Sequence, residues 1–185
     1  MKSRHTVLFV VLASLTLTFC APDSASAFTT NRLILQQGVI PTTNGVNVGV
    51  VAYTGAVDTH VIIDFPTTSY GTAPILRFHK HDISSNTIHA FIQFDNFQNY
   101  LPVNATVVGA KLYLTSAGDG DAFGNVNEFG AVNSAWADTM TWNTRNPAYS
   151  GRTPIGSWDY GGLNWPSNTV SSLDLTAALQ AWHDG

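Results

Sequence analysis

The chain has 185 residues, a formal net charge of −4 and only 11% charged residues. This length suits one domain with a sizeable core, and a hydrophobic share of 44% excludes a disordered polymer. The negative charge argues against nucleic acid as a partner, because phosphate binding requires a basic surface.

Residues 1–27 have the pattern of a secretory leader. Two basic residues precede the apolar run Val7–Phe19, and a small-residue stretch, SASA, follows it. The run is shorter than the roughly 20 residues that cross a bilayer, so we expect no membrane span, cleavage before Phe28, and a secreted or cell-surface protein. Cleavage would remove Cys20, the single cysteine, and leave residues 28–185 without disulfide or thiol chemistry.

Short segments with alternating apolar residues follow one another along the rest of the chain, separated by loops rich in Gly, Pro, Asn and Ser. In chain order the expected strands are NRLILQQ, DTHVII, PILRFHK, TIHAFIQFD, VVGAKLYLTSA, EFGAVNSAW and SSLDL. Only TAALQAWHDG has a helical pattern, with Thr176 as its expected N-cap. The pattern predicts an all-β fold, a β-sandwich of the jelly-roll kind.

Two of these strands have one clearly apolar face. In TIHAFIQFD this face holds Ile88, Ala90, Ile92 and Phe94, and in VVGAKLYLTSA it holds Ala110, Leu112 and Leu114. Because side chains alternate between the two sides of a strand, we expect these residues to face the core.

Two tryptophans, Trp136 and Trp142, stand six residues apart in a stretch of small polar residues. The spacing is even, so both rings leave the same face if the stretch is extended. Two indoles on one face form either a core plug or a platform for sugar rings. We expect the core role for both, and also for Trp182 in the predicted helix.

A glycine-rich stretch, GSWDYGGLNWPSN, carries Trp158, Tyr160 and Trp165. Loops present aromatic rings to solvent, and an indole can stack on the apolar face of a pyranose. These three residues are candidate carbohydrate-binding residues, with anchoring of the loop as the alternative.

Five stretches in sequence carry a resemblance to a known family: SYGTAPILRF, FIQFD, NATVVGAKLYL, WADTMTWNTRNP and LDLTAALQAWHDG. Together, over about Leu33 to Gly185, they resemble the DNRLRE-type domain, a polysaccharide-binding module found among alginate-degrading enzymes and as a repeat in archaeal disaggregatases. The resemblance implies one carbohydrate-binding β-sandwich over residues 28–185. Such domains usually continue into a further strand after the final Trp-x-x-Gly, so the resemblance also implies that this chain lacks its last strand at the C-terminus.

Basic residues are few, and the resemblance directs attention to one strand. Family members commonly carry basic residues along the strand that matches HAFIQFD, where this chain has His89 and Gln93. With Arg77 and Lys111, His89 is a candidate carbohydrate-binding residue, and the alternative is that these are ordinary solvated strand residues. The substitution weakens the case for alginate, because Arg or Lys matches a sugar carboxylate best.

Oxygen ligands suited to calcium occur in two places. Asp119, Asp121 and Asn125 lie in GDGDAFGN, and Asp58 and Asp174 lie near opposite ends of the chain. His79 and His81 have a spacing that can hold zinc, but no third ligand is identified. No cofactor is certain, and structural calcium is the metal that the residues favour.

No catalytic motif is found: serines lack a Gly-x-Ser-x-Gly context and the carboxylates form no acid/base pattern. We therefore expect a secreted, non-catalytic module that binds polysaccharide, with further domains of a longer protein as possible partners. One alternative is a structural or adhesive surface module without glycan binding. A polysaccharide lyase or hydrolase is the minor alternative.

Overall fold

The structure, a computed structural model, describes residues 14–22, 28–78, 87–102, 104–115, 126–159 and 170–184. The elements within these ranges are β1 (Ser14–Pro22), β2 (Phe28–Gln36), β3 (Thr42–Thr43), β4 (Val46–Asn47), β5 (Ala56–Ile62), β6 (Ile88–Phe94), η1 (Phe97–Tyr100), β7 (Thr106–Thr115), β8 (Val126–Ala131), α1 (Asn146–Ser150), β9 (Thr153–Asp159), β10 (Val170–Asp174) and α2 (Thr176–Asp184). Among these residues no helix has the length and apolar character needed to cross a membrane.

The fold is mostly β, as predicted. The described strands form three sheets, one in the order β10-β7-β1-β2-β3-β4 and two pairs, β5-β6 and β8-β9. These are several small antiparallel sheets, and they do not show the closed sandwich that the sequence predicted. The chain divides into two compact units: unit 1 contains Val57–Ile92 and Thr115–Thr169, and unit 2 contains Leu12–Ala56, Gln93–Leu114 and Val170–Gly185.

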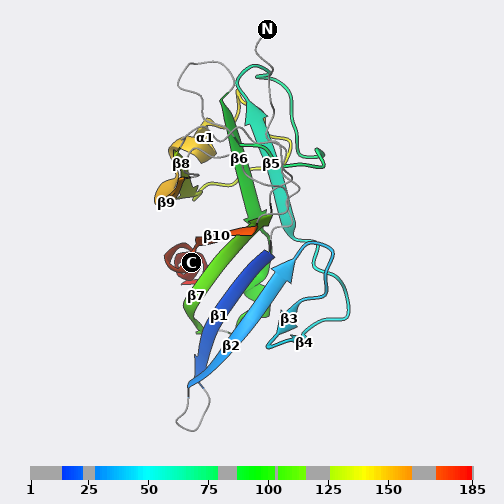
Figure 1. The fold of residues 1–185 in the computed structure, drawn as a ribbon, viewed down its shortest axis with the longest axis vertical. Helices are drawn as coiled ribbons and strands as arrows, with labels where there is room; N and C mark the ends of the chain where they lie inside the picture. The colour runs from blue at the N-terminus through cyan, green and yellow to red at the C-terminus, as the bar shows by residue number, and fades with distance from the viewer. Residues whose placement is uncertain are drawn as a thin grey trace. The chain divides into compact units, whose positions relative to one another are not determined.

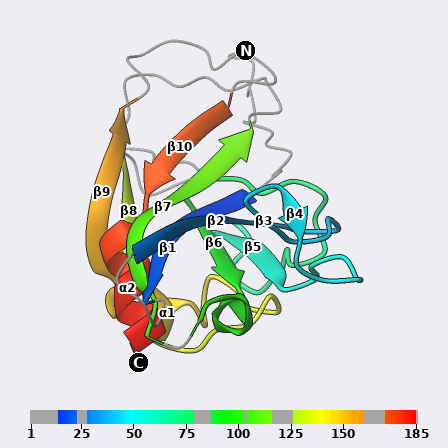
Figure 2. The same ribbon diagram turned by 90° about the horizontal axis from the view of Figure 1, so that it is seen from below.

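The six-stranded sheet of unit 2 has β1 near its middle, between β2 and β7 (Figure 1 and Figure 2). Both neighbours run antiparallel to it. Strand β1 was not predicted, because residues 14–22 lie inside the expected leader, whose removal stays a prediction.

Strand β7 faces the core of unit 2 as expected, with Ala110, Leu112 and Leu114 buried and Lys111 exposed. Val107 is also buried, although its position has the opposite parity. The register shift opposite Thr18/Phe19 explains this, because it places one extra residue on β7 and reverses the alternation.

Helix α2 forms where the sequence predicted a helix, but its cap differs from the expected one. The Asp174 carboxylate accepts a hydrogen bond from the Thr176 backbone N–H at 2.8 Å, while the Thr176 hydroxyl accepts one from the Ala110 N–H at 3.0 Å. The hydrogen bonds from Thr176 lower the pKa of Asp174. Leu179 is the fully buried residue of this helix, and Trp182 is half-buried.

Unit 1 has its core between strands β5 and β6, which lie side by side (Figure 1), and the segment that follows β8. A buried cluster joins Val61 of β5 and Phe91 of β6 to Met140 and Ala148. The predicted core face of β6 was therefore wrong: the face with Phe91 packs on this cluster, while the opposite residues are half-buried.

The stretch SYGTAP packs directly against the segment that carries the tryptophan pair. The Ser69 hydroxyl donates to the Asp138 carbonyl at 2.9 Å. A Cβ on Gly71 would lie 2.4 Å from that same carbonyl oxygen and 2.6 Å from the Asp138 Cβ. Only glycine allows this close approach.

Three strand predictions differ from the structure. PILRFHK forms no strand over its described residues: the chain bends at Pro74 and Ile75, and Leu76 makes an isolated bridge. EFGAVNSAW is a strand only as far as Ala131. Strand β9 was missed because its Pro and Gly residues indicate a loop. Its backbone hydrogen bonds with β8 stabilise the extended conformation, although the local strand propensity is low.

Candidate functional site

A short segment between β8 and β9 positions two aromatic rings and two arginines. The backbone turns at residues 141–144, where the Thr144 N–H donates to the Thr141 carbonyl at 3.1 Å and the Thr141 N–H donates to the Thr144 hydroxyl at 3.0 Å. Helix α1 follows, with Pro147 in its first turn, where a missing N–H costs nothing, and it ends before Gly151.

The two arginines repeat one local geometry. The Arg145 guanidinium carbon lies 3.4 Å from the centroid of the Trp142 ring, and its Nη1 donates to the Trp142 carbonyl. The Arg152 guanidinium carbon lies 4.0 Å from the Tyr149 centroid, and its Nη1 donates to the Tyr149 carbonyl at 2.7 Å. Each arginine thus covers the ring of the residue three positions before it, which is a cation–π arrangement.

His89 of β6 lies between these two pairs. Its ring is stacked on Tyr149 with centroids 4.1 Å apart and an interplanar angle of 9°, and it lies 4.9 Å from the Trp142 ring. We call Arg145, Trp142, His89, Tyr149 and Arg152 the ring–guanidinium stack. All five are half-buried.

Electrostatics keep the middle of the stack neutral. Burial, together with the charges of Arg145 and Arg152, lowers the pKa of His89 to about 4. Its Nδ1 has no hydrogen-bond partner among the described residues, and neither has the Nε of Arg145. A neutral imidazole avoids placing a third positive charge between two guanidinium groups.

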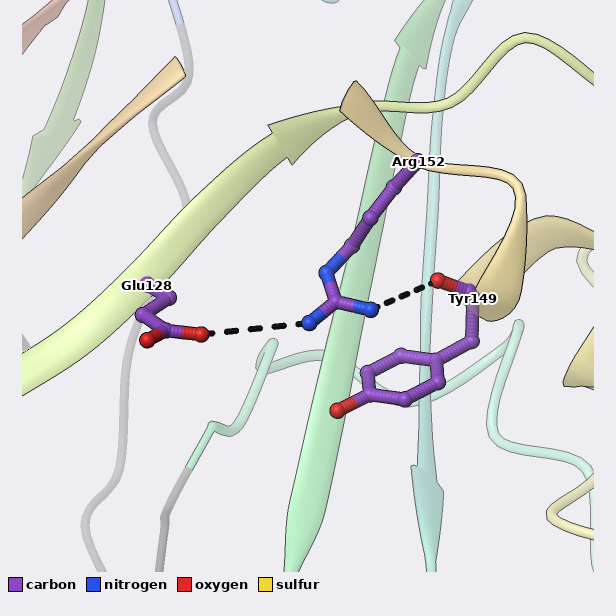
Figure 3. A network of polar contacts seen from close by, with 3 residues as sticks. All are labelled: Glu128, Tyr149 and Arg152. Carbon is purple, nitrogen blue, oxygen red and sulfur yellow. Dashed lines mark hydrogen bonds and ion pairs between the residues drawn. The ribbon is translucent and has the colours of Figure 1, made fainter. Parts of the chain in front are cut away.

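At the Arg152 end, the stack contacts a carboxylate (Figure 3). Its Nη2 lies 3.8 Å from the Glu128 carboxylate, and the side chains are 29% and 68% exposed. The stem of Arg152 passes over Gly130 of β8, where a Cβ would lie 2.9 Å from its Cγ. A long ion pair between exposed groups contributes little, about 0–1 kcal/mol, so Glu128 is a weakly held partner.

Acidification is expected to destabilise the fold between pH 6.5 and about 4. Burial lowers the pKa of His89 and of His60, which is stacked on Tyr70, to about 4 from the ordinary 6.5. Arg77 contributes to the shift of His60. The unfolded chain therefore binds these protons at a higher pH than the folded chain does, so their effect is absent above pH 6.5 and grows as the pH falls.

Thermal unfolding from pH 7.5 to pH 4 tests this expectation. The melting temperature should fall with pH, and the variant His60→Gln/His89→Gln should show a flatter profile. Asp58 acts in the opposite sense, because burial raises its pKa. Identical pH profiles for the variant and the wild type would contradict the assignment.

The tryptophan pair lies beside the core of unit 1. Trp136 and Trp142 are both half-buried and pack against the cluster of Val61, Phe91, Met140 and Ala148. The ring of Trp136 lies 5.7 Å from that of Phe91. Trp142 also belongs to the ring–guanidinium stack. The same side chain therefore packs against the core and forms part of the candidate site.

The other predicted binding residues are not members of the ring–guanidinium stack or lie outside the described residues. Arg77 is half-buried in unit 1, and Lys111 is exposed in unit 2. Trp158 lies in strand β9, opposite Asn127, and not in a loop as predicted. Tyr160 and Trp165 lie outside the described residues.

The predicted calcium ligands Asp58 and Asp174 lie in different units, Asp58 in unit 1 and Asp174 in unit 2, and the calcium prediction on this pair stays a prediction. The described residues contain no group of three or more His, Cys, Asp or Glu side chains that could hold a metal ion. Asp119, Asp121, Asn125, His79 and His81 lie outside the described ranges, so the calcium and zinc predictions on them stay predictions.

Sequence reasoning missed Arg145, Tyr149, Arg152 and Glu128. The sequence does contain a signal for three of them. An aromatic residue is followed by arginine three positions later in WNTR and again in YSGR. The structure shows that this spacing places each guanidinium on the preceding ring.

Comparison with known proteins supports the part of the resemblance that concerns a carbohydrate-binding module. The family model of carbohydrate-binding module family 96 matches residues 50–183. The tRNA nuclease WapA of Bacillus subtilis strain 168 is 25% identical over 138 residues, which are 69% of this chain and 6% of that protein. The tRNA3(Ser)-specific nuclease WapA of Bacillus spizizenii is 24% identical over the same length. The chain thus spans a small part of these relatives, and no solved structure matches it.

Proposed function

Because the chain belongs to carbohydrate-binding module family 96, we propose that it is a non-catalytic module that attaches to extracellular or cell-wall polysaccharide through the ring–guanidinium stack. The observation that carries this proposal is the placement of Arg152, a partly exposed guanidinium over the Tyr149 ring, whose Nη1 is bonded to the Tyr149 carbonyl while its Nη2 has only a long ion pair with Glu128 among the described residues. The expected leader supports export to the place where such polymers occur.

The stack offers a sugar charged hydrogen-bond donors held on an aromatic base. The rings fix the positions of the two guanidinium groups, and guanidinium N–H groups donate to hydroxyl or carboxylate oxygens. Glu128 now accepts from this direction at 3.8 Å, and a glycan oxygen at ordinary hydrogen-bond distance would replace it at little cost. The negative net charge of the chain favours a polysaccharide over a nucleic acid.

The nuclease names of the relatives describe proteins many times longer than the matching region. We therefore carry over from them only the idea that this module is part of a longer protein, whose other domains would supply any chemistry.

Affinity electrophoresis in gels that contain neutral or uronate-bearing polysaccharides tests the proposal. Arg152→Gln should weaken retention about tenfold on the polysaccharide that binds wild type, or roughly 1.4 kcal/mol, because a charged donor is lost. Arg32→Gln is the matched control, since Arg32 is an exposed arginine of β2 in unit 2. Glu128→Gln separates the two polymer classes: it should strengthen retention on uronate-bearing gels alone, because it removes a competing carboxylate.

Equal retention of wild type, Arg152→Gln and Arg32→Gln on every gel that binds would place the site elsewhere. Trp158, Tyr160 and Trp165 are then the next residues to replace. A complete lack of retention on all polysaccharides would favour a structural or adhesive module.

A further inference from the structure

Gly130 of β8 lies directly against the side chain of Arg152. A Cβ at this position would lie 3.1 Å from the Cβ of Arg152, 2.9 Å from its Cγ and 3.0 Å from its Cδ. Non-bonded carbon atoms are most stable about 3.5–4.0 Å apart. Three successive carbons of the arginine therefore occupy the space that the side chain of any other residue would fill.

An extra residue on β9 directs Arg152 to this side of the strand pair. The first register of β8 and β9 ends at Phe129, and Gly130 then pairs with Pro154, so Ile155 has no position opposite it. Without this bulge, Gly130 would stand opposite Ile155, and the alternation of side chains would place Arg152 on the other face. Bulges change the direction of nearby side chains in this way.

The guanidinium of Arg152 reaches its two neighbours by crossing residue 130. Glu128 and Gly130 are two positions apart in β8, so they belong to the same face of the strand. The Arg152 side chain crosses this face, with Nη2 3.8 Å from the Glu128 carboxylate and the guanidinium carbon 4.0 Å from the Tyr149 centroid (Figure 3). Its position therefore depends on open space at residue 130.

The backbone at Gly130 does not itself require glycine. Among the described residues, the glycines with positive φ are Gly38 and Gly45. A glycine within a strand weakens the strand, because it has more freedom to lose on folding and no side chain to pack. The close approach of the Arg152 side chain accounts for glycine at this position.

We propose that Gly130 is a positioning residue of the candidate polysaccharide site, whose missing side chain lets Arg152 cross β8 and present its guanidinium beside the Tyr149 ring. The ligand in this inference rests on the proposed function, whereas the position of Arg152 is a property of the free protein. A side chain at residue 130 displaces the carbons nearest the arginine backbone, so the guanidinium at the far end moves further than they do. A related module with a larger residue here would lose this donor even if it kept the arginine.

Nuclear magnetic resonance of the full chain tests the position without any glycan. The Nε–H proton of Arg152 is next to a guanidinium carbon that lies over the Tyr149 ring, so its signal should be shifted upfield by the ring current. Loss of the signal in Arg152→Gln assigns it. Gly130→Ala should move the signal towards that of a free arginine. Gly156→Ala is the matched control from the same strand pair, because a Cβ there would meet no atom within 4 Å, and it should leave the signal in place.

Retention on polysaccharide gels then tests the role in binding. On a gel that retains the wild type, Gly130→Ala should weaken retention about tenfold, as loss of the arginine does, and Gly156→Ala should not. In the Arg152→Ala background, Gly130→Ala should have no further effect, because the side chain that it displaces is already gone. Equal weakening by Gly130→Ala in both backgrounds would show a general structural effect and overturn the inference.

The two measurements separate failure of this inference from failure of the proposed function. A signal without an upfield shift in the wild type, or one that stays in place in Gly130→Ala, overturns the positioning role. A signal that moves while retention stays unchanged, or while no gel retains the protein, supports the positioning of Arg152 and contradicts the proposed function. If Gly130→Ala does not fold, Gly130→Ala/Arg152→Ala should fold again, because it lacks the arginine Cγ and Cδ. Failure of that double variant to fold overturns the inference.

Discussion

Trp142→Ala should lower the free energy of unfolding by about 3 kcal/mol, near the lower end for a large aromatic side chain because the ring is half-buried. The indole packs against the core cluster of unit 1 on one side. The Arg145 guanidinium lies 3.4 Å from the centroid of this ring, and the ring also contacts His89, so its loss leaves a half-buried cation without its aromatic partner. Urea-induced unfolding measured by far-UV circular dichroism gives the value.

Trp142→Phe is the matched control, because phenylalanine keeps an aromatic ring beneath Arg145. It should cost about 1 kcal/mol, less than the alanine variant. A normal unfolding midpoint for Trp142→Ala, combined with loss of retention on polysaccharide gels, would show that the ring is a sugar platform and not a packing element.

Gly71→Ala should also destabilise the protein by about 3 kcal/mol, a large effect for one methyl group. The added Cβ would lie 2.4 Å from the Asp138 carbonyl oxygen. That atom belongs to the backbone and cannot rotate away, so the loop holding Gly71 and the segment holding Asp138 must separate. The separation would also strain the hydrogen bond from Ser69 to the same carbonyl.

Gly156→Ala serves as the control for this substitution. Gly156 lies in β9 of the same unit, and a Cβ there would meet no atom within 4 Å. It should leave the unfolding midpoint unchanged or slightly raised, because alanine restricts the unfolded chain. Equal effects of the two substitutions would mean that general loss of glycine flexibility, and not the contact with Asp138, determines the cost.

Strands with a local signal were predictable, and strands that depend on a partner were not. The alternation in residues 87–95 and 107–117 predicts β6 and β7, and the helical pattern after residue 175 predicts α2. The apolar pattern of residues 14–22 indicates a leader, so β1 was not predicted. The Pro and Gly residues of β9 indicate a loop. In both cases the segment forms a strand because it pairs with a neighbouring strand, and its own residues do not indicate this pairing.

The candidate site was predictable only in part, for a similar reason. His89 was identified through the family resemblance, but its two ring neighbours come from a segment more than fifty positions later in the chain. Tertiary packing decides which face of β6 contacts that segment. The strand was therefore predicted correctly, but its core face was not. The spacing of three positions from ring to arginine is visible in the sequence. Whether it places the guanidinium on the ring depends on the turn and helix between Thr141 and Gly151.

The ring–guanidinium stack has an evolutionary consequence that follows from how its parts are anchored. Its rings also hold unit 1 together, so selection for stability restricts them whatever ligand is bound. The two arginines lie on top of those rings, and within the described part of the chain their hydrogen bonds go to backbone carbonyls of the same segment, with one long contact from Arg152 to Glu128. Related modules can therefore exchange arginine for a neutral or smaller residue and acquire a new ligand preference, while the aromatic positions beneath remain.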